Sequence, residues 1–117
     1  MNSLEFVTLV AKEKASMLTM YFEPNSGAAV STAISELNLT AEQKEKMKAI
    51  VNDVLTDTFY NFILALDGSA SLGDDQRIYD LKDDHGNRLS GSGELEAAAW
   101  ELFQNPKNET TEPNQSV

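Results

Sequence analysis

A long helical pattern between Thr40 and Leu66 constrains the fold of this chain more than any other feature of its sequence. Thr40 and Gln43 fit a capping box, in which the hydroxyl accepts from the backbone N–H of Gln43 and the Gln43 side chain reaches back. Apolar residues then recur with helical period. We predict one helix ending near Leu66, with Phe62 and the rest of this stripe in the core. The stripe consists of Met47, Ile50, Val51, Val54, Leu55, Thr58, Phe59, Phe62, Ala65 and Leu66.

Two shorter helices are predicted before this one. Between Ser3 and about Phe22, apolar residues recur at helical spacings, and Ser3 can cap the first turn. Residues 23–27 contain proline and glycine, which disfavour helix and favour turns, so the first helix should end there. Residues 28–37 again place apolar side chains on one face, and a short second helix is expected.

The predicted fold class is α+β, mainly helical, because a small antiparallel β-hairpin is expected before the last helix. Residues 77–82 suit a half-buried strand, and residues 83–87 have the composition of a turn. Residues 88–90 are short enough to form the return strand. A short amphipathic helix containing Trp100 should follow the glycine-rich joint at 90–93. Its apolar positions are Leu95, Ala98, Ala99, Leu102 and Phe103.

The length of 117 residues predicts a single domain, which we place at residues 1–103. Residues 104–117 are rich in Asn, Thr, Pro, Glu and Gln, so a disordered C-terminal tail is expected there. No apolar run approaches the ~20 residues that span a bilayer. The first residues also lack the basic-then-apolar layout of a secretory signal, which makes a cytoplasmic location the expectation.

The charge of the chain excludes several functional classes. With 19 acidic and 9 basic residues, the net charge of −10 opposes direct binding to nucleic acid or to an anionic membrane. The absence of cysteine excludes disulfides, thiol nucleophiles and thiolate metal sites. The single histidine, His85, cannot supply an imidazole-rich zinc site. We therefore expect no cofactor and no metal.

Catalytic motifs are also missing. Placing Gly86 at the sixth position of an EF-hand loop puts Leu81 first and Ser92 twelfth, where calcium requires carboxylates. A Ser/His/Asp site would have to use His85 in a polar turn, and no G-x-S-x-G element is present. Carboxylate pairs are abundant, but nothing in the sequence indicates a pocket that would separate their pKa values. We expect that the protein is not an enzyme.

The acidic residues are concentrated in the C-terminal half of the chain. Residues 1–60 carry 8 acidic and 5 basic side chains, whereas residues 61–117 carry 11 and 4. This excess is typical of a solvated face that maintains solubility, or of a docking surface for a basic protein. Tyr60 and Trp100 fall off the apolar stripes and are the aromatic residues expected at an interface. The candidate partner-binding residues are Asp67, Asp74, Asp75, Asp80, Asp83, Asp84, Glu94, Glu96, Tyr60 and Trp100.

Residues 57–103 resemble small acidic bacterial proteins of the toxin-immunity kind. The resemblance lies in an apolar helix ending in Leu66-Asp67-Gly68, a polar turn at residues 84–87 and a closing acidic helix at residues 94–103. It implies a cytoplasmic, non-catalytic inhibitor that binds a basic toxin or effector domain tightly. A small adaptor, a regulatory subunit and a mimic of nucleic-acid charge remain alternatives.

Overall fold

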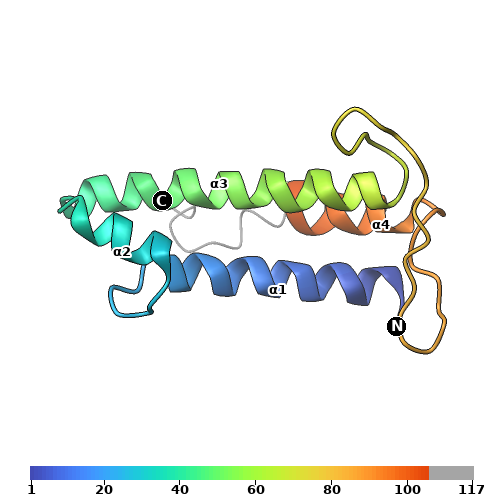
Figure 1. Cartoon of the computed structure of the whole chain (residues 1–117), viewed down its shortest axis with the longest axis horizontal. Coiled ribbons are helices and arrows are strands. Elements are labelled where there is room, and N and C mark those ends of the chain that lie inside the picture. The colour runs from blue at the N-terminus through green and yellow to red at the C-terminus, as the bar shows by residue number, and fades with distance from the viewer. Residues whose placement is uncertain (106–117) are drawn as a thin grey trace.

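The computed structural model describes residues 1–105, and within this range every regular element is a helix (Figure 1). The elements are α1 (Ser3–Tyr21), α2 (Ala29–Glu36), α3 (Ala41–Leu66) and α4 (Glu94–Ala99), which continues into the π-helical turn η1 (Trp100–Gln104). The expected α+β class is wrong, because the described residues contain no β-strand. None of the described helices combines the length and the apolarity needed to cross a membrane.

Residues 67–93 form a long loop where the β-hairpin was expected. Only one residue pair, Lys82 and Arg88, makes an antiparallel bridge across the expected strands. The Ser90 hydroxyl occupies backbone groups that would otherwise pair between strands. It donates to the carbonyl of Tyr79 and accepts from the N–H of Leu81 at 2.8 Å. Serine side chains compete with regular backbone pairing in this way. The segments therefore lie close together without forming strands.

The N-terminus of α1 is capped by Asn2, and not by Ser3 as the sequence suggested. The Asn2 side chain accepts from the N–H of Glu5 at 2.8 Å, and the Glu5 carboxylate accepts from the N–H of Asn2 at 2.9 Å. Ser3 is buried, and its hydroxyl donates to the carbonyl of Leu89 at 2.9 Å. Ser3 thus ties α1 to the end of the loop.

Helix α3 has the predicted cap and the predicted end, but only part of its apolar stripe is buried. The capping box is confirmed, with 3.1 Å from the N–H of Gln43 to the Thr40 hydroxyl and 2.9 Å for the return bond. Four members of the stripe are exposed instead: Thr58, and the apolar residues Ile50 by 59%, Val54 by 57% and Phe62 by 49%. The most deeply buried large side chain of α3 is Ile63, which the stripe omitted.

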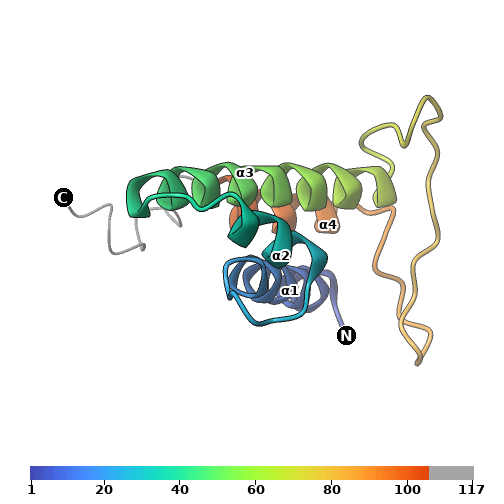
Figure 2. The ribbon, with the colours of Figure 1, turned by 60° about the vertical axis from the view of Figure 1, so that its left-hand side comes forward.

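The partial burial of α3 follows from the arrangement of the helices. Helices α1 and α3 run in opposite directions, and α4 fills the space between them only at the end that holds the start of α1 (Figures 1 and 2). The first half of α3, which contains Ile50, has no helix α4 beside it. Phe62 lies in the second half, one residue before the buried Ile63, and therefore points to a different side of the helix. The core cluster consists of Val7, Ile63, Leu95, Ala98, Ala99 and Phe103.

The last helix confirms the sequence pattern. Leu95, Ala98, Ala99 and Phe103 are buried, Leu102 is half-buried and Trp100 is exposed. Of the expected C-terminal tail, Gln104 belongs to η1 and Asn105 follows it. The remainder of that tail, residues 106–117, lies outside the described residues.

Candidate protein-binding site

Asp67 connects α3 to α4 and is not a surface residue. It ends α3 and is only 6% exposed. Its carboxylate accepts from the N–H of Gly91 at 2.5 Å and from the N–H of Glu96 at 3.1 Å. The first N–H groups of a helix have no partner within the helix, so Asp67 caps α4 from another element. Asp67, a member of the predicted partner-binding site, is therefore buried and stabilises the fold.

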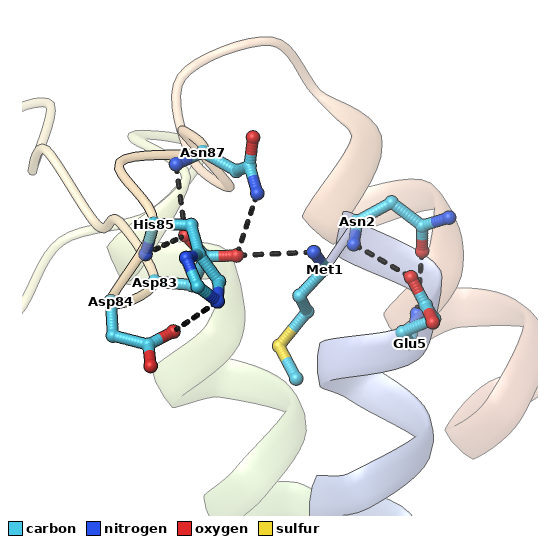
Figure 3. A network of polar contacts seen from close by, with 7 residues as sticks. All are labelled: Met1, Asn2, Glu5, Asp83, Asp84, His85 and Asn87. Atoms are coloured by element: carbon cyan, nitrogen blue, oxygen red, sulfur yellow. Dashed lines mark hydrogen bonds and ion pairs between the residues drawn. The ribbon is translucent and has the colours of Figure 1, made fainter.

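Asp83 is held inside the turn at residues 83–87 of the loop (Figure 3). Its side chain, 9% exposed, accepts from the N–H groups of His85 and Asn87 and from the Asn87 amide, each at 2.9 Å. The α-amino group of Met1 lies 3.1 Å away and pairs with the same carboxylate. Hydrogen bonds from the side chain and the N–H of Asn87 hold the pKa of Asp83 well below its ordinary value, although desolvation opposes them. The hydrogen bond to Asp83 raises the pKa of the Met1 amino group.

The other loop acids differ in how far nearby cations compensate them. Asp75 pairs with Arg77 at 2.5 Å, and Asp80 lies 3.3 Å from both Lys82 and Arg88. The Asp84 side chain is 88% exposed and lies 3.9 Å from His85, which carries charge only when protonated. Asp74 is exposed, and its side chain makes no hydrogen bond or ion pair within residues 1–105. Asp74 and Asp84 are therefore the loop acids most available to a partner.

The two predicted glutamates lie on α4, apart from the tip of the loop. Glu94 is exposed, and within the described range its side chain has no hydrogen bond or ion pair. Glu96 is also exposed and accepts from the Ser69 hydroxyl at 2.9 Å. Trp100, one turn beyond Glu96, is 46% exposed, whereas Tyr60 on α3 is half-buried against the core.

Two shallow hollows flank the exposed side of α4. One has a volume of about 400 Å³ and lies between α4 and the start of α1, where its lining includes Leu4 and Glu94. The other, of about 450 Å³, lies between α4 and α3 and is lined by Tyr60, Glu96 and Trp100 among others. Ala97 and Glu101 line both hollows and form the ridge between them. We call this surface the α4 face; it consists of Leu4, Tyr60, Glu94, Glu96, Ala97, Trp100 and Glu101.

The α4 face contains residues that the sequence did not single out as site residues. Leu4 belongs to the apolar pattern of the first helix, yet it is 55% exposed. Ala97 and Glu101 lie three and seven residues after Glu94, so helical spacing from Glu94 could have placed them on one face. No such signal exists for Leu4, because its position depends on the packing of α1 beside α4.

The described residues contain no cluster of three or more His, Asp or Glu side chains placed to hold a metal ion. Comparison of the chain with protein-family models, with curated proteins and with solved structures gives no match. The contacts and surfaces of this structure are therefore the basis for assigning a function.

Proposed function

We propose that the protein is a non-catalytic, cytoplasmic binding protein that inhibits a cognate bacterial toxin or effector through its acidic surface. The observation that carries this proposal is the set of exposed carboxylates Asp74, Asp84 and Glu94, none of which lies beside a permanently charged cation within the described residues, together with the exposed Trp100. A basic partner domain would be attracted by these charges and would associate faster because of them. Trp100 is the residue type that most often supplies binding energy at the centre of an interface.

The hydrogen bonds that hold the loop support the same function. The Asp67 carboxylate bonds the loop to α4, the Asp83 carboxylate pairs with the Met1 amino group, and the Ser90 hydroxyl joins two segments of the loop to each other. A binding surface that is ordered before the encounter loses less conformational entropy on association. Tight inhibition by a small protein benefits from such preorganisation.

Compensated charges make mimicry of nucleic acid the weaker alternative. A charge mimic would present uncompensated carboxylates, whereas Arg77, Lys82 and Arg88 lie beside Asp75 and Asp80. An adaptor or regulatory subunit would use the same surface as an inhibitor. These two roles differ in whether the partner loses its activity in the complex.

The test is capture of the partner from the native host, followed by measurement of its activity and of the association rate. The variant Asp74→Asn/Asp84→Asn/Glu94→Gln should associate several-fold more slowly than the wild type at low salt. The matched control, Glu45→Gln/Asp53→Asn/Asp57→Asn, removes three exposed acids from α3 and should associate like the wild type. Equal rates for both variants would show that the acids serve solubility only. A bound partner that keeps full activity would favour the adaptor.

A further inference from the structure

The α4 face exposes apolar surface that the fold leaves uncovered. Leu4 is 55% exposed on one side of α4, and Trp100 is 46% exposed on the other. Between them the ridge is low at Ala97, which extends only as far as its Cβ atom. A second chain can therefore approach the backbone of α4 closely, with one large side chain in each hollow. Small residues on a helix permit this kind of ridge-into-groove contact.

The charges around these hollows indicate the chemistry of the second chain. Glu94 borders the hollow beside α1, Glu96 borders the hollow beside α3, and Glu101 borders both. Among the described residues, no Lys or Arg lines either hollow. A complementary segment must be apolar at its centre and basic along its edges. An amphipathic helix with Lys or Arg flanking its apolar stripe has this pattern.

We infer that the α4 face binds the apolar side of a basic amphipathic helix that the partner protein supplies, with Trp100 as its aromatic anchor. This inference rests on the proposed function, since it specifies which segment of a basic partner the protein holds. The partner helix packs against α4, its apolar side chains enter the two hollows, and its cations pair with Glu94 and Glu96. Trp100 loses its remaining exposure on binding.

Trp100 is the only tryptophan in the chain, so its fluorescence reports contact at this face directly. The probe is a synthetic Leu/Lys peptide of about 15 residues with helical period, a length at which an isolated helix becomes marginally stable. A peptide of the same composition but scrambled order has the same charge and no apolar face. The amphipathic peptide should shift the Trp100 emission to shorter wavelength with saturation, and the scrambled peptide should not.

A matched pair of protein variants locates the contact. Ala97→Arg places a cation on the ridge and should weaken binding of the amphipathic peptide by at least about tenfold, because it repels the peptide and obstructs the approach. Ala49→Arg makes the same change at an exposed alanine of α3 and should bind like the wild type. Thermal unfolding of both variants, in which Arg replaces an exposed helical alanine, verifies that the fold is intact.

Equal binding of the amphipathic and scrambled peptides, or wild-type affinity in Ala97→Arg, would overturn the inference. These outcomes are independent of the capture experiment with the native partner. Inhibition of a captured toxin together with unchanged binding by Ala97→Arg would retain the proposed function and reject the α4 face as its helix-binding site. Specific peptide binding without inhibition of the captured partner would retain the α4 face as a helix-binding site and reject inhibition as the function.

Discussion

Asp67 and Asp83 hold the loop 67–93 against the rest of the molecule, Asp67 beside the start of α4 and Asp83 beside the Met1 amino group. Both were expected at a partner interface, and both instead accept hydrogen bonds from neighbouring backbone groups. An acidic side chain in a loop is typically solvated, so composition cannot distinguish these two from Asp74 or Asp84. The distinction depends on Gly91, Glu96 and Asn87 lying within reach of the carboxylates.

Substituting Asp67 by alanine should destabilise the protein strongly. The substitution leaves the N–H groups of Gly91 and Glu96 without their acceptor, which should cost about 2–3 kcal/mol. Asp74→Ala is the control and should change stability by less than about 0.5 kcal/mol, since Asp74 is exposed. Denaturant unfolding of the two variants measures the difference. Similar values would show that Asp67 does not hold α4 in place.

The lowered pKa of Asp83 predicts a specific dependence of stability on pH. A carboxyl whose pKa is lower in the folded state adds stability above its unfolded pKa of about 4. This contribution disappears as the pH falls through the lower folded value. The stability difference between wild type and Asp83→Asn should therefore be largest near neutral pH and should shrink below about pH 4.

The stability that the Met1 amino group contributes depends on pH in the opposite sense to that of Asp83. Its pKa is raised in the folded state, so its contribution is present below about pH 8 and is lost as the pH rises through the raised value. Unfolding curves of wild type and Asp83→Asn across this whole range test both limits. A difference that does not vary with pH would contradict the ion pair.

At the scale of elements, the sequence predicted what local contacts determine. The Thr40–Gln43 capping box and the end of α3 at Leu66 were predicted correctly, because both depend on residues close in the chain. The hairpin was not, because the Ser90 hydroxyl pairs with Tyr79 and Leu81, nine or more residues away. Which side of α3 is buried depends on where α1 and α4 pack against it, and periodicity alone does not contain that information.

The face of α3 can be tested with two adjacent residues. Ile63 is 2% exposed and belongs to the core cluster, so Ile63→Ala should cost on the order of 2–5 kcal/mol. Phe62, which the sequence placed in the core, is 49% exposed, and Phe62→Ala should cost about 1 kcal/mol or less. Chemical denaturation of both variants decides between the two orientations. A larger loss of stability for Phe62→Ala than for Ile63→Ala would show that Phe62 is in the core, as the sequence pattern predicted.

At the scale of the whole molecule, the candidate site was only partly visible in the sequence. Trp100 could be identified because it falls off the apolar stripe of its helix, and Glu94 and Glu96 because acids are abundant in this region. The α4 face as a unit could not be predicted, since Leu4 reaches it from the opposite end of the chain. Its composition depends on α1, α3 and α4 meeting at one end of the molecule.

Composition predicts that residues 106–117 are dispensable for stability. The segment has few apolar side chains, so its burial could not offset the conformational entropy lost on ordering it. A chain ending at Asn105 should have the melting temperature of the full chain and the same affinity for the captured partner. A clear decrease in either quantity would show that this segment contributes contacts.

The hydrogen bonds of Asp67 also determine which changes of length and sequence the loop tolerates. One carboxylate joins the first residue of the loop to Gly91, near its last, so the loop leaves and re-enters the helical body at almost the same point. Because the ends of the segment are joined, doubling its length adds only about 0.6 kcal/mol of closure entropy. The tip around Asp74 can therefore change in length and sequence without separating α3 from α4. New partner specificities can arise there while the core stays the same.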